Sequence, residues 1–554
     1  MTSPPDAGSP SLSRPFRADA NNKRLSLENM HIMTRLASLA ACCFALAGFG
    51  IVSSSKADAT TTSLFYLSSN PSADVANALR LAISKMKSGD TKGAEADLIT
   101  LAGTPGVKTA SPRMRFSVHI ALAYCQQSNG ETESAYQSTM KGGELDPSAR
   151  NREYWYLLMQ VAQATQRNYV AADSLIHALE SEPGRASEID IAEIWSMYDA
   201  TAEMNDGGAH RRALLETLWQ VNYAPKNATD LSSMQRFWAQ LFESYVDIGD
   251  SNKAQTVLAA INNPYEILRL RADNRYRRFI DGNLRLADIK VVIRQYIASL
   301  QDQMASHPRQ IGAAESLANA LMMTGQSSDA LQLLDQTLEK VSTAPKDQPA
   351  FDDLNENLRW VLNARARVLA RLGHWNAALA AQKAARDDAP MPDGDVVSQR
   401  INLGDLLYRL ERPREALEEI KNVSATNASP YGLLEAGEVR TCSWAQIGNK
   451  LQTKSSLSAM LAQRDLDPDA LRAALLCAND EARLAKVVIA RLRDRQTRNS
   501  ELANDQTYLP IPSATRYDRL MEERLQRVLA RPDVRAALDQ YGVIDTYPLL
   551  APDH

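Results

Sequence analysis

The chain has 554 residues, of which 62 are Lys or Arg and 66 are Asp or Glu, so its formal net charge is −4. This slightly acidic balance gives no electrostatic footprint for DNA or RNA, and 44% apolar with 23% charged residues excludes a largely disordered chain. The length favours several domains or one extended array, and the abundance of Ala, Leu, Gln and Glu favours helices.

Residues 1–59 contain the pattern of an export signal. Arg35 precedes a nearly uninterrupted apolar run, Leu36–Val52. Ala57-Asp58-Ala59 follows and has the small-x-small form that a signal peptidase recognises. We therefore interpret residues 33–59 as a signal peptide that is cleaved near Ala57 or Ala59, and we expect a periplasmic or secreted protein.

Residues 1–32 are polar and rich in Pro and Ser, which is unusual ahead of a signal peptide. We interpret them as an extension that is disordered or lies upstream of the true start, which would then be Met30 or Met33. The alternative is an uncleaved inner-membrane anchor, which Lys23 and Arg24 on the cytoplasmic side would support.

Two of the five cysteines, Cys42 and Cys43, lie inside the signal, which leaves Cys125, Cys442 and Cys477. Three scattered cysteines do not form a disulfide framework. We interpret them as small buried apolar residues. A bridge between Cys442 and Cys477 stays open as an alternative.

After the signal, a motif recurs with a period of about 40 residues, which is in the range of helical-repeat arrays. Its clearest copy is Trp238-x-x-Leu241-x-x-x-Tyr245-x-x-x-Gly249-Asp250-x-x-x-Ala254, which is closed by Pro264. The three apolar side chains share one face of a first helix. The glycine allows a tight turn, the alanine lets a second helix approach closely, and the proline ends that helix.

The small residue of the motif marks eight copies along the chain. The marker residues are Ala94, Ala135, Ala171, Ala213, Ala254, Ala330, Ala378 and Ala416, most of them preceded by a glycine such as Gly89, Gly130, Gly208, Gly325, Gly373 or Gly404. The wide gap between Ala254 and Ala330 predicts a degenerate hairpin over 265–307, with helices over 265–280 and 286–306. Two further hairpins are expected between Pro430 and Asp494.

The motif resembles the tetratricopeptide repeat over about residues 72–495, although most copies exceed that family's usual length of about 34 residues. The resemblance implies an all-α fold: a right-handed solenoid of about ten to eleven antiparallel helix hairpins. We expect an N-terminal array over 72–264, the degenerate hairpin over 265–307 and a C-terminal array over 308–495.

The remaining residues follow the repeats. Residues 496–515 are polar, contain two prolines and are interpreted as a linker. Residues 516–554 contain an amphipathic helix from about Tyr517 and a short helix that begins at Asp533. Because a solenoid needs a terminal element over its last apolar face, we interpret 516–554 as capping helices.

The sequence contains no motif for catalysis or for a cofactor. It has no HExxH, no CxxC, no P-loop, no strand–GxGxxG–helix and no GxSxG elbow, so we expect no metal site, no cofactor and no enzyme activity. The cluster of Arg269, Arg271, Arg275, Arg277 and Arg278 is interpreted as an exposed helix whose arginines pair with acids. An anion site there stays an alternative.

In the tetratricopeptide family, the first helix of each hairpin lines a concave surface that holds peptides. The resemblance therefore implies partner-binding side chains one helical turn away from the packed face. They are Tyr124, Tyr156, Gln160, Gln163, Arg236 and Glu243 in the N-terminal half and Asn319, Asn363, Arg367, Arg371 and Tyr408 in the C-terminal half. Asn363 and Arg367, at i and i+4, are expected to face one groove.

The sequence thus predicts a non-catalytic scaffold in the bacterial periplasm that binds a protein or peptide, in envelope assembly, secretion or polysaccharide export. One alternative is a glycan-active envelope enzyme with an unrecognised site, which a pocket with two or more carboxylates would favour. The other alternative is a membrane-tethered adaptor. We expect no nucleic-acid partner.

Overall fold

The computed structural model of the chain describes residues 71–201, 204, 206–226, 231–345, 347–388, 395–464 and 466–551. The predicted extension 1–32 and the predicted signal 33–59 lie outside these residues. Across the described ranges, no helix is both long and apolar enough to cross a membrane. The described residues form two units, which we call the N-terminal unit (71–223) and the C-terminal unit (224–551).

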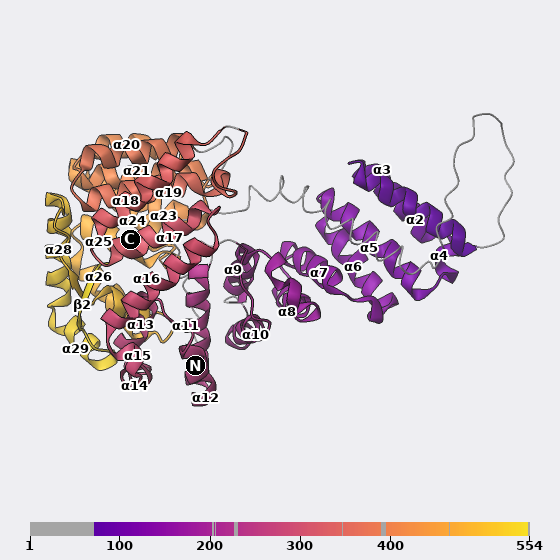
Figure 1. Cartoon of the computed structure of the whole chain (residues 1–554), viewed down its shortest axis with the longest axis horizontal. Coiled ribbons are helices and arrows are strands. Elements are labelled where there is room, and N and C mark those ends of the chain that lie inside the picture. Colours follow the sequence, from indigo (N-terminus) through magenta and orange to yellow (C-terminus); the bar gives the residue numbers. More distant parts are fainter. Residues whose placement is uncertain are drawn as a thin grey trace. The chain divides into compact units, whose positions relative to one another are not determined.

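The N-terminal unit is built from antiparallel helix hairpins (Figure 1). The hairpins are α2 (Pro71–Lys87) with α3 (Thr91–Gly103), α5 (Pro112–Ser128) with α6 (Thr132–Leu145), and α7 (Arg152–Ala164) with α8 (Asn168–Ser181). α9 (Ile191–Ala200) and α10 (Gly207–Gln220) follow, and α10 packs on α8. The short helices between them are α4 (Pro105–Thr109), η1 (Pro147–Ala149) and η2 (Pro183–Glu188).

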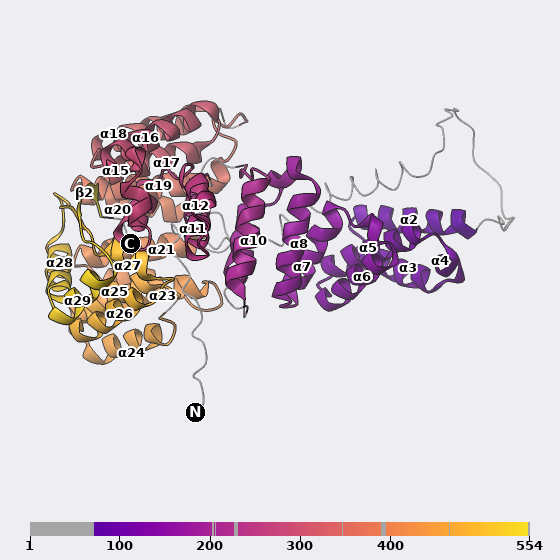
Figure 2. The same cartoon turned by 90° about the horizontal axis from the view of Figure 1, so that it is seen from below.

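The C-terminal unit continues the same arrangement, and its hairpins succeed one another from α17 and α18 to α23 and α24 (Figure 2). Its first helices are α11 (Leu231–Asp247), α17 (Ile311–Met323), α19 (Leu354–Arg371), α21 (Asp395–Arg409), α23 (Pro430–Ile447) and α25 (Pro468–Cys477). Their second helices are α12 (Ser251–Leu258), α18 (Ser327–Thr343), α20 (Trp375–Asp387), α22 (Pro413–Glu419), α24 (Lys450–Leu461) and α26 (Glu481–Arg493). The predicted all-α solenoid is confirmed.

The turn inside a hairpin has one recurrent conformation. A residue with positive φ ends the first helix, and the next amide donates a hydrogen bond to the carbonyl at i−5, as from Asp250 to Tyr245 (2.9 Å). Glycine fills this position in most of these turns, with φ between 78° and 91°. Gln166, Glu411 and Asn479 fill it elsewhere, at φ near 57°. The predicted turn glycines are therefore confirmed, except for Gly208 and Gly404, which lie inside helices α10 and α21.

The marker alanines lie where the two helices of a hairpin touch. Seven of the eight are fully buried, with exposed fractions of 0% at positions 94, 135, 171, 254, 330, 378 and 416. Ala213 is half-buried. A side chain larger than a methyl group at these positions would hold the two helices apart, so the recurrent alanine sets the spacing within each hairpin.

The positive φ at Glu411 predicts a stabilising substitution. A non-glycine residue in the left-handed region costs about 1 kcal/mol or more, so we expect Glu411→Gly to raise the free energy of unfolding by about 1 kcal/mol. Gly325→Ala is the matched control, because a Cβ there meets no atom within 4 Å but φ is +80°. Gly325→Ala should lower the free energy of unfolding by a similar amount in urea titrations. Changes of the same sign in the two variants would contradict this account.

The degenerate hairpin differs from its prediction in one helix. Its second helix, α16 (Ile289–Ser306), nearly matches the predicted 286–306. Its first helix is interrupted: α13 (Pro264–Ala272) ends at the buried Asp273, and α14 (Arg277–Asp281) and α15 (Leu284–Ala287) follow. Asp273 accepts hydrogen bonds from the amide and the guanidinium of Arg275 instead of continuing the helix.

The segment 496–515, which we predicted as a linker, contains regular structure and buried side chains. It holds α27 (Arg498–Asn504) and the strand β1 (Thr507–Leu509), and Asn499 and Leu502 are fully buried. After it come α28 (Arg516–Leu529), α29 (Pro532–Tyr541) and the strand β2 (Thr546–Leu550), which pairs with β1 in parallel. α28 and α29 pack against α26, at the end of the last hairpin. The prediction missed these strands.

The C-terminal unit closes on itself where α13 ends. The amide of Val543 donates to the carbonyl of Ala272 (2.9 Å), and the amide of Asn274 donates to the carbonyl of Tyr541 (3.2 Å). A Cβ on Gly542 would lie 2.5 Å from the Ala272 oxygen, so only glycine permits this approach. α27 also packs on α13. These contacts place α13 with the end of the chain, and the compact unit begins at residue 224, not after the predicted boundary at 264.

Cys442 and Cys477 form a disulfide between α23 and α25, with 4.9 Å between their Cα atoms. The two cysteines are 35 residues apart in the sequence and lie on successive first helices, Cys442 inside α23 and Cys477 at the end of α25. Both are buried, with exposed fractions of 0% and 6%. The interpretation of these two residues as free buried thiols is therefore wrong, whereas Cys125 is free and buried.

The disulfide should contribute strongly to the stability of the C-terminal unit. Cross-linking residues 35 positions apart removes about 4 kcal/mol of chain entropy from the unfolded state. We expect the double variant Cys442→Ala/Cys477→Ala to lose most of that amount in urea unfolding, and a reductant to leave the variant unchanged. Cys125→Ala controls for the loss of a buried thiol. A variant as stable as the oxidised protein would contradict the expectation.

Candidate functional site

In the N-terminal unit, polar side chains form a band across successive first helices. The Tyr156 hydroxyl on α7 donates to Glu193 Oε1 on α9. Gln160 Oε1 accepts from Gln127 Nε2 on α5 (3.1 Å), and Gln160 Nε2 lies 3.5 Å from Glu193 Oε1. Gln163 Nε2 donates to Ser196 Oγ (2.7 Å). The band therefore crosses α5, α7 and α9, and we call these residues the first-helix band.

The band unites three residues that the sequence predicted with three that it missed. Tyr156, Gln160 and Gln163 were predicted, and the predicted Tyr124 is buried on α5, with 5% of its surface exposed. Gln127, Glu193 and Ser196 were missed. Gln127, Gln160 and Glu193 follow one another at intervals of 33 residues, as Gln163 and Ser196 do. A search for polar residues at one fixed register would therefore have found them.

The band is accessible as well as polar. Gln127, Gln160, Gln163, Glu193 and Ser196 are all half-buried as residues, although the atoms Gln163 Oε1 and Glu193 Oε2 are buried. Amide and hydroxyl groups both donate and accept hydrogen bonds, as a peptide backbone does. The arrangement can therefore bind main-chain groups of an extended segment without proton transfer or covalent chemistry.

Arg236 and Glu243, also predicted to bind a partner, belong instead to a buried ion-pair network between α11 and α13. Arg269, with 4% of its surface exposed, contacts Glu243 (2.7 Å) and Glu266 (2.8 Å), and Arg236 contacts Glu266 (3.3 Å). Burial alone would raise the pKa of Glu266, but the two arginines outweigh it and lower that pKa. The network holds two first helices together.

The other arginines of the predicted cluster also contact acids or aromatic rings. Arg271 and Arg277 both pair with Asp281, and Arg275 pairs with Asp273 (2.7 Å). The Arg278 guanidinium lies over the Phe279 ring. The predicted pairing of the arginines therefore describes the cluster better than an anion site does, but the predicted single exposed helix is wrong, because Arg269 is buried and α13 ends at Ala272.

In the C-terminal unit, the predicted residues bond to neighbouring elements. Arg367 on α19 donates to Asn319 on α17 (3.5 Å), while Asn363 accepts from Asn402 on α21 (3.2 Å). Asn363 and Arg367 therefore bond to the first helices on the two sides of α19. Arg371 donates to the carbonyl of Ala551 (3.2 Å).

A cluster of four carboxyl groups on α21, α23 and the start of α25 was not predicted. The Tyr408 hydroxyl donates to Glu438 Oε1 (2.6 Å). Burial and the nearby Asp405 raise the pKa of Glu438 well above its ordinary value. Burial and Asp467 do the same for the pKa of Glu435, which shares a hydrogen bond with Asp467. Burial raises the pKa of Asp467 to about 6.

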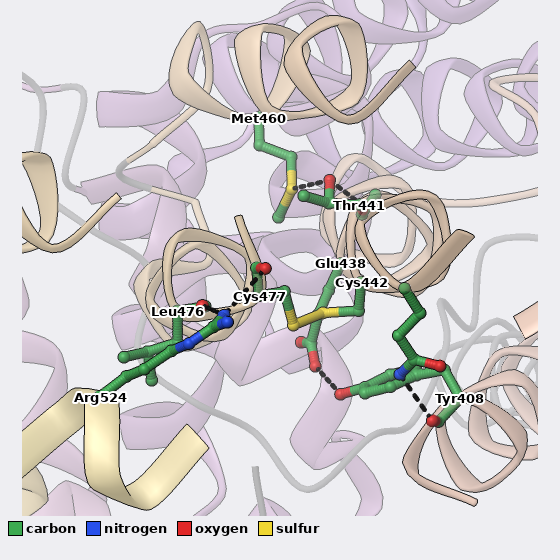
Figure 3. The surroundings of a disulfide bond; sticks show 10 residues. Tyr408, Glu438, Thr441, Cys442, Met460, Leu476, Cys477 and Arg524 are labelled. Atoms are coloured by element: carbon green, nitrogen blue, oxygen red, sulfur yellow. Dashed lines mark hydrogen bonds between the residues drawn. A yellow bond between two sulfur atoms is a disulfide. The ribbon is translucent and has the colours of Figure 1, made fainter. Parts of the chain in front are cut away.

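The disulfide lies beside Glu438 and Tyr408 of this cluster, as Figure 3 shows. Glu438 is one helical turn before Cys442, and Arg524 of α28 donates to the carbonyls of Leu476 (2.5 Å) and Cys477 (3.1 Å). α21, α23, α25 and α28 are thus joined by one covalent and several polar contacts. Among the described residues, no group of three or more His, Cys, Asp or Glu side chains could hold a metal ion.

The carboxyl cluster predicts how stability depends on pH. Asp467 has a pKa of about 6 in the folded protein and 3.8 as its ordinary value, so the folded state binds a proton that the unfolded state releases between these values. Stability should therefore rise as the pH falls from 7.5 to 5. Asp467→Asn, which keeps the helix cap to Ala470, should remove about 1 kcal/mol of this rise.

Asp480→Asn, at the more exposed cap of α26, is the control and should leave the pH dependence unchanged. Urea unfolding of the three proteins at both pH values measures the effect. A rise in stability toward pH 5 that is as large in Asp467→Asn as in the wild type would contradict the account.

No family model matches the chain, and no curated protein matches it. Among solved structures, a human IFIT1 dimer with PPP-AAAA is 13% identical to this chain, with a TM-score of 0.30. The match covers 77% of this chain and 90% of the IFIT1 chain. A Rap protein complexed with competence and sporulation factor is 10% identical, with a TM-score of 0.27, and the match covers 83% of this chain and 99% of the Rap chain. The APC/C hetero-tetramer Cut9-Hcn1 is 11% identical, with a TM-score of 0.26, and the match covers 82% of this chain and 90% of the matched chain. At such low TM-scores, the assignment of an all-α solenoid depends on the helices of this chain alone.

Proposed function

We propose that the protein is a non-catalytic scaffold that binds an extended segment of a partner protein along the first-helix band of its N-terminal unit. The observation that carries this proposal is the band itself, in which amide, hydroxyl and carboxylate groups of half-buried residues repeat at intervals of 33 residues over three helices. Groups repeated along a line suit a ligand with a repeating backbone.

Charge favours a basic partner segment. Residues 71–223 contain 14 Lys or Arg and 19 Asp or Glu. Glu193 lies within the band, between Tyr156 and Gln160. An acidic surface accelerates the association of a basic segment and weakens that of an acidic one.

The bacterial periplasm is the compartment that we propose, with a role in envelope assembly, secretion or polysaccharide export. The signal pattern of residues 33–59 supports export. The disulfide between Cys442 and Cys477 supports an oxidising compartment, because disulfides persist in the periplasm and are rare in the cytosol. A membrane-tethered adaptor would share both features, and N-terminal sequencing of the mature chain separates the two.

The carboxyl cluster is the observation that bears on a glycan-active enzyme. Glycosidases place their carboxyl groups on both sides of an open substrate cleft. Here Asp467 and Glu438 are buried, with exposed fractions of 2% and 8%, and their partners are Glu435 and Tyr408. This burial favours a role in holding α21, α23 and α25 together, and it supports the scaffold over the enzyme.

The proposal predicts where a partner can be captured. A photo-activatable amino acid at position 163, in the band, should cross-link a protein from envelope extracts. The same amino acid at position 137, on the exposed face of α6, is the control and should capture none or a different protein. The double variant Gln160→Ala/Gln163→Ala should bind the captured partner about thirtyfold more weakly, because each of the two hydrogen bonds contributes about 1 kcal/mol.

The matched control for that variant is Gln137→Ala/Gln220→Ala, which removes two exposed glutamines from α6 and α10. It should bind as the wild type does. Equal affinities for all three proteins, or equal cross-linking at positions 137 and 163, would refute the proposal.

A further inference from the structure

The last strand of the chain lies on first helices of the C-terminal unit. The Tyr265 hydroxyl on α13 donates to the carbonyl of Leu550 (2.9 Å), and Arg371 on α19 donates to the carbonyl of Ala551 (3.2 Å). β2 also contacts α17. Both hydrogen bonds go to main-chain oxygens, which any extended segment would present. The helices thus contact β2 as a protein contacts a bound peptide.

The side chains of β2 are buried in this position. Tyr547, Leu549 and Leu550 expose 2%, 0% and 5% of their surfaces. The Tyr547 ring lies near Arg271, Arg277 and Asp281 of the interrupted hairpin. Burying two leucines and a tyrosine provides several kcal/mol of transfer free energy, and the surface therefore selects apolar side chains.

Side-chain burial holds β2 in place, whereas its strand pairing is limited. Among the described residues it pairs with the short strand β1 alone, and a two-stranded sheet is marginally stable by itself. Pro548 has no amide hydrogen to donate to a ladder. The Tyr547 hydroxyl, although buried, has no hydrogen-bond partner among the described residues.

The joint that closes the unit lies before β2 and is separate from it. Tyr541 and Val543 bond to Asn274 and Ala272, while β2 begins at Thr546. β2 can therefore leave its surface without breaking the contact between α29 and α13. The short connection between the joint and β2 keeps the strand at an effective concentration in the millimolar range.

We propose that β2 is a ligand held in cis, and that an extended aliphatic segment of a partner protein displaces it and pairs with β1 in its place. The surface of α13, α17 and α19 is then a second binding surface, distinct from the first-helix band and independent of the function proposed for that band. Its occupation by the chain's own strand limits binding to segments that compete with β2.

The test uses the full-length chain and a labelled peptide with the sequence of residues 544–551, Ile-Asp-Thr-Tyr-Pro-Leu-Leu-Ala. Leu549→Asp should expel β2, because its carboxylate cannot be buried unpaired. We expect hydrogen exchange of the 546–551 amides with solvent to accelerate at least tenfold, while the amide hydrogen exchange of α13 and α29 stays unchanged. The peptide should bind this variant at least tenfold more tightly than it binds the wild type.

Leu520→Asp, at a position of α28 with 37% exposure, is the matched control and should behave as the wild type does. Adding Tyr265→Phe to Leu549→Asp removes the hydroxyl that holds the Leu550 carbonyl, and peptide affinity should fall about fivefold. Tyr265→Phe alone, which introduces no charge, should accelerate exchange only in 546–551.

The proposal is overturned if β2 is released and the peptide binds no better than to the wild type. It is also overturned if exchange in α13 and α17 accelerates together with that of β2 in both Leu549→Asp and Tyr265→Phe. β2 would then be a structural part of the unit. If Leu549→Asp unfolds the unit and Tyr265→Phe does not, the amide hydrogen exchange of the Tyr265→Phe variant decides between the two outcomes.

Discussion

The C-terminal unit depends on one close contact between two main-chain segments. Gly542 lies against the carbonyl of Ala272, and the amides on either side of that contact form hydrogen bonds between segments from distant parts of the sequence. Without this joint, the hairpins from α11 to α26 would be an open array with two apolar ends. With this joint, α27 and α29 cover one end of the array and contact the segment at α13. The break between α13 and α14, in the first helix of the degenerate hairpin, leaves room for this contact.

The hairpins could be predicted from sequence because local physics determines them. A turn that needs positive φ, a buried alanine and a terminal proline are all within one repeat, so a single sequence shows them. Turns with Gln166, Glu411 or Asn479 carry no such signal, and neither does the end of α13 at Asp273. β1, β2 and the joint at Gly542 were missed because they form only when distant segments meet, and a polar composition concealed the burial of Asn499 and Leu502.

The candidate sites were predictable to a smaller extent. Spacing placed Tyr156, Gln160 and Gln163 correctly on one band, because the register of a helix is a local property. It could not show that Arg236 and Glu243 are paired with residues of the next first helix, or that Arg367 and Asn363 reach opposite neighbours. Whether a polar side chain meets solvent or a neighbour depends on helix packing, which the repeat pattern does not contain. Cys442 and Cys477 lie on successive first helices, 35 residues apart, which was a usable signal for their bridge.

The position of the joint has a consequence for how the protein is made. Contacts in the N-terminal unit connect neighbouring hairpins, so that unit can fold before later residues are present. α13 is synthesised early but has to wait for Gly542, and until then the apolar ends of its unit stay uncovered. Domains with such distant contacts fold slowly and aggregate readily. We therefore expect the second half of this chain to need a chaperone until its synthesis is almost complete.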